Sequence, residues 1–247
     1  MLGFLNKNWR GMAWFVTFYS ISAVLSVLLI WSPFISRKAT LFSCHLWQRV
    51  NGWLEKYIAG VHWRIEGTEN LPPTGCFIFA CKHQSAWETL KTHLLFPDPA
   101  IVLKKELMAI PLWGRFVRKL GNIPIDRGQG AQALTLMMQA AEQVKAAGRP
   151  IIIFPQGTRV LPHQDKPYKN GVIRLYRHLQ VPLVPVALNS GKIWPKGALW
   201  PQAGTVTINI LPAIEAGLPN EIVAPQLRDA IETATAALYT PPAGVNA

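Results

Sequence analysis

The sequence predicts an α/β fold, a layered mixed sheet with helices on its faces, preceded by N-terminal membrane helices. From about residue 61, short β-rich runs alternate with longer helical stretches, which is typical of a sheet covered by helices. The 26 residues between Arg10 and Arg37 carry no charge. The length of 247 residues allows one α/β domain of roughly 200 residues and an attachment. We therefore expect a membrane-associated helical segment at 1–60, an α/β domain at 61–240 and a tail at 241–247.

The N-terminal segment favours contact with a membrane. Its uncharged stretch is long enough to cross a bilayer as a helix, and Trp9, Trp14 and Trp31 lie near its two ends, as in an interfacial aromatic belt. Basic residues flank both ends equally, so the positive-inside rule assigns no orientation. A second, amphipathic helix is expected at about 40–58. The segment is therefore either a spanning helix or a re-entrant helix pair.

The remaining elements follow in a regular order. We expect strands at 63–65, 76–81, 100–103, 122–125, 150–154, 183–188 and 206–211. Helices are expected at 86–95, 111–119, 129–147, 169–179 and 221–238, the last as an amphipathic cover on the sheet. Binding sites in such folds cluster at the carboxyl ends of the strands. The polar residues that follow each apolar run are therefore the candidates for function.

The charge of the chain restricts its partners. The net charge is +12, with +4 in residues 1–81, +11 in 82–196 and −3 in 197–247. This field attracts nucleic acid, an anionic membrane surface or a phosphorylated substrate. The basic residues do not form runs with interleaved aromatic residues and glycines, so no nucleic-acid partner is expected. A non-catalytic basic protein that binds membranes or nucleic acid remains an alternative.

The cysteine pattern indicates neither a disulfide framework nor a metal site. Cys44, Cys76 and Cys81 are odd in number and irregularly spaced. We interpret them as small apolar residues of a protein from a reducing compartment, and we expect no metal.

The first motif pairs a histidine with a carboxylate. The run at 76–81 is followed by Lys-His-Gln-Ser-Ala-Trp-Glu-Thr, which separates His83 from Glu88 by five residues. The two side chains can meet only if His83 lies in a turn and Glu88 in the first turn of the next helix. Imidazole could then deprotonate a hydroxyl nucleophile while the carboxylate orients the ring. Alternatively, Glu88 only completes a capping box with Ser85.

Cations follow three further strands. Pro-Gln-Gly-Thr-Arg, residues 155–159, offers a glycine that allows close approach of a ligand and an arginine that can hold a phosphate. The strand at 122–125 ends in Asp126 and Arg127, and the strand at 100–103 ends in Lys104 and Lys105. Four strand ends thus present basic or imidazole groups, which favours a site for an anionic substrate.

Taken together, four blocks resemble the glycerolipid acyltransferase family over about residues 63–195. They are KHQSAWETL, GNIPIDRG, FPQGTR and VPLVPV, in that order. The resemblance implies that His83 is the general base and Glu88 its paired acid. It also implies that Arg127 and Arg159 bind the acceptor's phosphate, that Gly157 and Thr158 shape that pocket, and that Lys105 assists. Pro185, in the fourth block, would line the side of the acyl thioester.

The implied reaction moves a fatty acyl group from acyl-CoA or acyl-carrier protein to the free hydroxyl of 1-acylglycerol-3-phosphate. It needs no cofactor besides the donor. The implied location is the bacterial inner membrane, with the catalytic domain on the cytoplasmic side. Two positions depart from the family pattern, since Glu88 replaces the usual Asp and Gln156 replaces the usual Glu. If the family's Glu contacts the acceptor, Gln156 opens the alternative of another lyso-lipid acceptor, such as an amino-acid lipid, a lysophospholipid or a lipid A precursor.

Overall fold

The computed structural model describes residues 2–240 except 97, 127, 129 and 163. It contains a seven-stranded sheet in the order β1-β7-β6-β2-β5-β3-β4. The strands are β1 (Val61–Glu66), β2 (Ile78–Cys81), β3 (Ala100–Lys104), β4 (Ile123–Ile125), β5 (Ile151–Ile153), β6 (Leu183–Leu188) and β7 (Gly204–Ile210). β7 runs antiparallel to β6, and every other neighbouring pair is parallel. The predicted mixed sheet is confirmed.

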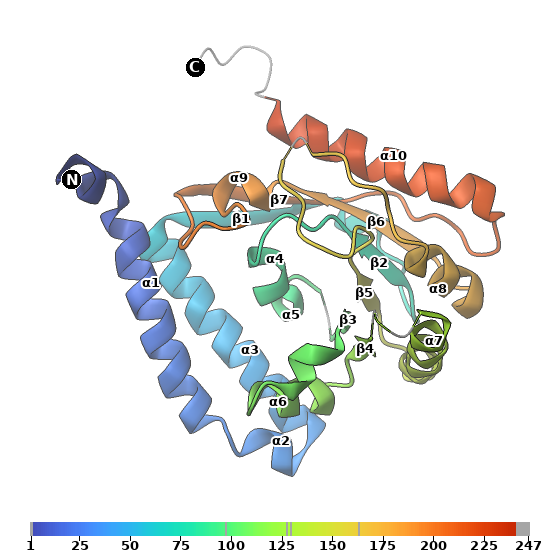
Figure 1. Ribbon diagram of the computed structural model, residues 1–247, viewed down its shortest axis with the longest axis horizontal. Helices are drawn as coiled ribbons and strands as arrows, with labels where there is room; N and C mark the ends of the chain where they lie inside the picture. Colours follow the sequence, from blue (N-terminus) through green and yellow to red (C-terminus); the bar gives the residue numbers. More distant parts are fainter. Residues whose placement is uncertain (1, 97, 127, 129, 163, 241–247) are drawn as a thin grey trace.

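Helices cover both faces of the sheet (Figure 1). One face carries α7 (Gly130–Ala146), α8 (Gly171–Leu179) and α10 (Asn220–Tyr239). The short helices α4 (Trp87–Leu90), α5 (Thr92–Leu95) and α9 (Ser190–Ile193) lie on the other side, with α6 (Trp113–Lys119) beyond them. The 3-10 turns η2 (Thr68–Asn70) and η3 (Lys105–Ala109) complete the connections. The helix expected at 86–95 is divided into α4 and α5, because Lys91 leaves the helical conformation.

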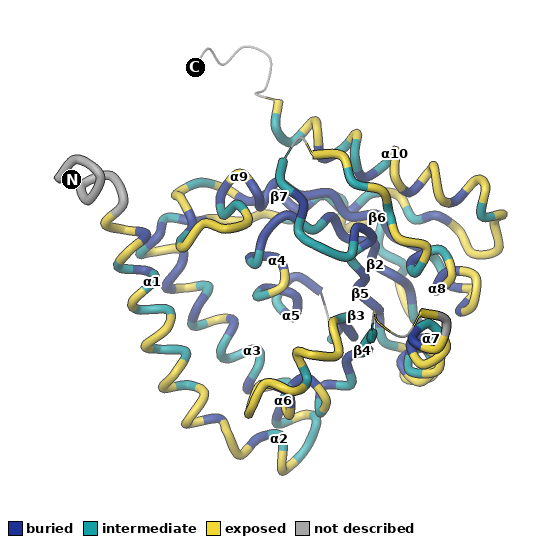
Figure 2. Tube along the Cα trace, in the orientation of Figure 1, coloured by how far each residue is buried: buried dark blue, intermediate teal, exposed yellow. Residues whose placement is uncertain are grey.

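Alternation along the central strands builds a separate core on each face. In β2, Ile78 and Ala80 pack toward α7, α8 and α10, while Phe79 and Cys81 pack toward the opposite face. All four are buried, as expected for strands covered on both sides. Figure 2 shows this burial along the middle of the sheet.

The N-terminal segment is a helical hairpin that lies against the domain. It consists of α1 (Leu2–Leu28), the single turn α2 (Ser32–Ile35), α3 (Arg37–Leu54) and the π-helical turn η1 (Glu55–Ala59). The stretch Trp9–Ile35 contains an 18-residue window with a mean hydropathy of 2.0 and is long and apolar enough to cross a membrane. The turn at α2 sends α3 back alongside α1 (Figure 1). Ser36 begins α3, since its hydroxyl accepts a hydrogen bond from the Ala39 N–H.

The hairpin contacts the α/β domain at two separated points. About midway along α1, Trp14 is 1% exposed and meets Trp194 edge-on, with ring centroids 5.1 Å apart. Near the turn, Arg37 forms an ion pair with Asp98 (2.5 Å). The domain therefore lies against the hairpin from the middle of α1 to the turn.

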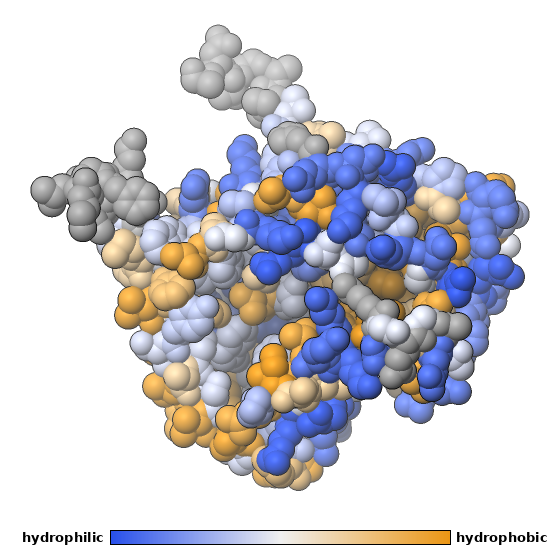
Figure 3. Space-filling model, in the orientation of Figure 1, coloured by the Kyte–Doolittle hydropathy of each residue, from blue (hydrophilic) through white to orange (hydrophobic). Residues whose placement is uncertain are grey.

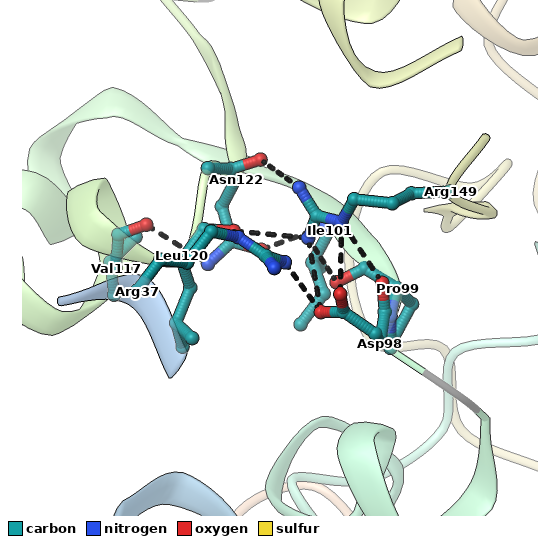
Figure 4. A network of polar contacts seen from close by, with 9 residues as sticks. Arg37, Asp98, Pro99, Ile101, Val117, Leu120, Asn122 and Arg149 are labelled. Carbon is teal, nitrogen blue, oxygen red and sulfur yellow. Dashed lines mark hydrogen bonds and ion pairs between the residues drawn. The ribbon is translucent and has the colours of Figure 1, made fainter. Parts of the chain in front are cut away.

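A polar network surrounds the Asp98 contact (Figure 4). Arg149 reaches Asp98 from the chain before β5 and also donates to the carbonyls of Pro99 and Leu120. Asn122 accepts a hydrogen bond from the Ile101 N–H (2.9 Å). Burial lowers the pKa of Arg149, and the adjacent Asp98 opposes that shift. The network joins the hairpin to the loops that precede β3, β4 and β5.

Candidate active site

The register of the parallel strands brings three loops to one edge of the sheet. Ala80 of β2 pairs with Ile153 of β5, and Cys81 pairs with Val186 of β6. The segments that follow these strands begin at Lys82, Phe154 and Asn189, and they lie beside one another at the carboxyl edge. This is where folds with parallel strands place their sites.

His83 and Glu88 are in direct contact. The distance from His83 Nδ1 to Glu88 Oε1 is 2.8 Å. His83 lies in the turn after β2 and Glu88 in α4, as the spacing requires. The Glu88 side chain is 2% exposed and that of His83 is 16% exposed. With the carboxylate as acceptor, Nδ1 carries the ring proton and Nε2 is the basic nitrogen.

Glu88 accepts hydrogen bonds from three further donors. Its Oε1 accepts the backbone N–H groups of Gln84 and Ser85, both at 2.8 Å, and its Oε2 accepts the Ser190 hydroxyl at 2.7 Å. The Ser85 hydroxyl accepts the N–H of Trp87 (3.1 Å). Glu88 therefore both helps to begin the helix and holds the histidine, so the two interpretations of the motif describe one arrangement.

Aromatic and ionic contacts fix the surroundings of His83. Its ring stacks on Phe154, with centroids 4.1 Å apart. Its carbonyl accepts the N–H of Val160 (2.8 Å). The preceding Lys82 is buried and pairs with Glu232 of α10 at 2.5 Å, where Tyr168 also donates to Glu232. Burial and the carboxylate of Glu232 raise the pKa of Tyr168, so the phenol stays protonated and can donate.

A cavity of about 1020 Å³ opens beside His83. Its wall includes Phe154 near the histidine, Leu25 and Trp47 of the hairpin, and Met137 of α7. It is predominantly apolar and lies between the hairpin and the sheet. Its size is at the upper end of ligand pockets, which typically hold about 300–1,000 Å³.

Only some of the residues that were predicted to bind substrate line this cavity. Gly157, Thr158 and Arg159 line it, and Gly157 has a φ of 66°, a conformation that favours glycine. Lys105 lies in η3 with an exposed side chain 3.4 Å from Asp126. Lys104, one residue earlier, contributes to the cavity wall instead. Arg127 is outside the described residues.

Gln156 and Pro185 lie behind the cavity wall. Gln156 is 1% exposed, its Oε1 accepts the backbone N–H of His83 (3.3 Å) and its Nε2 donates to Glu232 (3.4 Å). Pro185 is buried in β6 opposite Ala80. The cavity lining includes neither residue. Both residues therefore support the framework of the site. The resemblance implied that they contact substrate, and their position differs from that expectation.

Ser190 and Lys169 are members of the site that sequence reasoning missed. Ser190 lies two residues after β6 and bonds Glu88, and Lys169 lines the cavity next to Gly171. The rule that sites follow strand ends could have identified Ser190, because it follows the LVPVAL run. Lys169 precedes a helix instead, and no strand signal marks it.

The buried titratable groups fit the surrounding chemistry. Burial, with a contribution from Glu88, raises the pKa of Cys81 well above its usual value, so the thiol is neutral and behaves as an apolar residue. Burial, assisted by the nearby His45, lowers the pKa of His93 to about 4. The described residues contain no cluster of three or more side chains suited to hold a metal ion.

Comparison with known proteins identifies acyltransferases among the proteins that resemble this chain. The family model described as "Acyltransferase" matches residues 62–189. The 1-acyl-sn-glycerol-3-phosphate acyltransferase of Pseudomonas aeruginosa is 35% identical over 170 residues, which are 69% of this chain and 66% of that protein. The 1-acyl-sn-glycerol-3-phosphate acyltransferase alpha of Mus musculus is 26% identical over 181 residues, or 71% of this chain and 63% of that protein. The matched part thus spans slightly less than two thirds of these curated relatives.

A solved structure shares the fold. The crystal structure of the 1-acyl-sn-glycerophosphate (LPA) acyltransferase from Thermotoga maritima superposes with a TM-score of 0.78 at 20% identity. The superposition covers 96% of this chain and 99% of that one, so it includes the hairpin as well as the sheet.

Proposed function

This chain belongs to the acyltransferase family, and we propose that it transfers a fatty acyl group from a thioester donor to the free hydroxyl of 1-acylglycerol-3-phosphate, giving phosphatidate. The observation that carries the proposal is the His83–Glu88 contact at the mouth of a large, mostly apolar cavity. The names of the relatives indicate the same acceptor. Membership in an enzyme family removes the alternative of a non-catalytic basic binding protein.

His83 acts as the general base in the proposed reaction. Its Nε2 takes the proton of the acceptor hydroxyl as that oxygen attacks the thioester carbonyl carbon. The carbon–sulfur bond then breaks, and the sulfur leaves with the proton that the imidazolium returns. The acyl group passes directly from sulfur to oxygen, and no group on the protein is acylated.

Glu88 orients His83 and stabilises its protonated form. The carboxylate is buried and accepts the ring N–H, two backbone N–H groups and one hydroxyl. Four donors hold it in a single position, so it can fix the tautomer of the ring. Its negative charge lies next to the imidazolium when that ion forms, where the low exposure of both groups strengthens the attraction.

Arg159, Lys104 and Lys169 bind the anionic groups of the substrates. All three line the cavity that His83 enters, and they come from three different segments of the chain. Arginine can hold a phosphate with two parallel hydrogen bonds, and lysine adds a point charge. The acceptor's phosphate therefore lies on the Arg159 side of the cavity, with its free hydroxyl at His83. We keep Arg127 and Lys105 as further proposed phosphate contacts.

The apolar part of the cavity holds the acyl chain. Residues of α1, α3 and α7 form that part of the wall. An acyl chain placed there leaves its thioester carbonyl near His83. Acyl-CoA and acyl-carrier protein present the same thioester to His83, so we propose either as the donor. No cofactor other than the donor takes part.

The hairpin places the enzyme in one leaflet of the membrane. Its outer face carries exposed apolar residues from all three helices, namely Val16, Tyr19, Val24, Val27, Leu28, Phe34, Ile35 and Phe42. Figure 3 shows apolar residues gathered over the hairpin, in contrast to the hydrophilic surface over α8 and α10. Trp14 and Arg37 hold the hairpin against the domain, which supports a hairpin that rests in one leaflet over a helix that crosses the bilayer. We place this face on the cytoplasmic leaflet of the bacterial inner membrane.

The test is acyl transfer by detergent-solubilised protein from long-chain acyl-CoA and from acyl-carrier protein to lysophosphatidate. We expect phosphatidate from the wild type and a loss of about 10²–10⁴-fold in kcat for His83→Ala, the usual range for a general base. His178→Ala, on the far side of α8 beside Glu142, is the matched control and keeps full activity. A wild type that is folded and inactive with both donors would overturn the assignment, and so would an active His83→Ala variant.

A second experiment tests the identity of the acceptor. Gln156 faces Glu232 and the backbone of His83, so its position gives no support to a different head group. A panel of amino-acid lysolipids, lysophospholipids and lipid A precursors should therefore give lower kcat/KM than lysophosphatidate. A preference for an acceptor without a phosphate would remove the role proposed for Arg159.

A further inference from the structure

Three buried polar side chains meet where the hairpin joins the active site. Glu55 opens η1, the π-helical turn that follows α3. Its Oε1 accepts the indole N–H of Trp87 (2.5 Å), and its Oε2 pairs with Lys91 Nζ (2.7 Å). The side chains of Lys91 and Glu55 are 4% and 5% exposed, and Trp87 is completely buried.

This cluster is specific in its geometry. Each carboxylate oxygen of Glu55 has its own donor, so the desolvated charge is compensated from two directions. Lys91 reaches past α3 at Gly52, where an added Cβ would lie 3.2 Å from its Nζ. π-helical turns are rare and often occur at functional sites. The hairpin thus presents one carboxylate to α4, and the absence of a side chain at Gly52 leaves room for the Lys91 ammonium group beside it.

Two residues of the cluster lie on either side of the proposed catalytic carboxylate, Glu88, in the sequence. Trp87 directly precedes Glu88, and Lys91 lies one helical turn after Trp87. α4 has only four residues, and such a short helix has little stability of its own. Glu88 faces His83 and Ser190, while Trp87 and Lys91 face Glu55. The position of α4 therefore depends on the contacts of Glu88 on one side and on the contacts with Glu55 on the other.

We propose that Glu55 is a positioning residue for acyl transfer, which fixes α4 through Trp87 and Lys91 and thereby sets Glu88 against His83. The inference rests on the proposed acyl transfer. It assigns to the hairpin a role in the geometry of the reaction, in addition to membrane contact and the cavity wall. Among the described residues, Glu55 contacts Trp87 and Lys91 and does not line the cavity, so it acts through α4.

The first test is steady-state kinetics on single variants. Glu55→Gln keeps an oxygen for the Trp87 indole and leaves the charge of Lys91 without a partner. Lys91→Met leaves the charge of Glu55 without a partner. We expect each to lower kcat by about 10²-fold with little change in KM for either substrate, as is typical when a distant change shifts reacting groups by about 1 Å. Val144→Ala, which loosens the core on the opposite face of the sheet, is the control for lost stability alone.

A double variant separates positioning from loss of one contact. Glu55→Gln combined with Lys91→Met leaves no unpaired charge and keeps the indole hydrogen bond. We expect its kcat to recover most of the loss seen in either single variant, which is a coupling that two independent defects would not give. Equal kcat for Glu55→Gln, Val144→Ala and wild type would overturn the proposal, and so would additive losses in the double variant.

Two further measurements keep the test decisive. If the single variants do not fold, Trp87→Phe removes only the indole donor and keeps the ion pair, and its kcat should fall while its KM stays constant. The indole ¹⁵N–¹H signal that disappears in Trp87→Phe identifies Trp87, and it should shift in Glu55→Gln. That signal reports the cluster even in a protein without acyl transfer, so failure of the proposed function can be told apart from failure of this inference. An unshifted signal contradicts the cluster itself.

Discussion

Ser190 donates its hydroxyl to Glu88 across 2.7 Å, although 102 positions separate the two residues in the sequence. Ser190 begins α9 after β6, and Glu88 lies in α4 after β2. Because β2 and β6 are parallel neighbours, their following segments meet at the same edge. The contact ties the carboxylate to a second strand of the sheet.

Replacement of Ser190 tests how much that contact contributes. Ser190→Ala leaves Glu88 Oε2 buried without its donor, which costs about 1–3 kcal/mol in the free energy of unfolding. We expect kcat to fall about tenfold, equivalent to about 1.4 kcal/mol in the barrier. Urea unfolding and steady-state kinetics measure the two effects, with Ser20→Ala on the exposed face of α1 as the control. Unchanged values for both would show that Glu88 does not depend on this hydroxyl.

Glu88→Gln tests the charge of the carboxylate. Glutamine keeps an oxygen for the backbone N–H groups of the turn and removes the negative charge beside the imidazolium. We expect a loss of about 10²–10⁴-fold in kcat, comparable to the loss of a general acid–base residue, with the protein still folded. Circular dichroism and the acyl-transfer assay decide the result. A variant with near wild-type kcat would reduce Glu88 to its capping role.

The size of the cavity predicts a change in acyl-chain preference. Leu25 of α1 lines the cavity, and the neighbouring Val24 is 53% exposed on the outer face. Leu25→Trp should shift the preferred donor toward shorter acyl chains, because the larger ring fills space that a long chain needs. Val24→Trp should leave the profile unchanged. A series of acyl-CoA donors of increasing length gives the comparison, and identical profiles for both variants would place the acyl chain elsewhere.

His93 predicts loss of stability in mild acid. Burial lowers its pKa to about 4 in the folded protein, while the unfolded chain binds that proton at about pH 6.5. Neutral His93 therefore makes its full contribution to the free energy of unfolding above pH 6.5. That contribution, about 3 kcal/mol in total, is lost as the pH falls from about 6.5 to about 4. Urea unfolding at pH 7 and pH 5 measures it.

The controls for this prediction are two histidine variants. His93→Gln should remove most of the difference between the two pH values, because glutamine binds no proton. His178→Gln, with a side chain that is 43% exposed, should keep that difference. Equal pH dependence in His93→Gln and wild type would assign the effect to other groups.

The sequence predicts the parts of the fold that depend on local pattern. All seven strands were expected within a few residues, because each is a short apolar run between turns. The strand-end rule placed His83, Glu88 and the Gly157–Arg159 segment correctly at one edge. These predictions hold because each needs only residues adjacent in sequence and the common direction of parallel strands.

Features that depend on distant partners could not be predicted. Gln156 turns toward Glu232, a residue 76 positions away that no motif connects to it. Lys104 lines the cavity and Lys105 does not, because the chain changes from strand to 3-10 turn between them. The break between α1 and α3 lies within the uncharged stretch, so no charged residue marks it. Ser32, Pro33 and Ser36 were the available signals, since proline and serine favour helix starts.

The place of α10 in the sequence has a consequence for the order in which the contacts around His83 form. Glu232 neutralises Lys82, and Tyr239 donates to Gln84, so both sequence neighbours of His83 contact α10. This helix follows every other described element in the chain. During synthesis, the hairpin and the sheet strands leave the ribosome well before these two residues. The residues on both sides of His83 therefore gain these two contacts last, when α10 docks on the strands that were made before it.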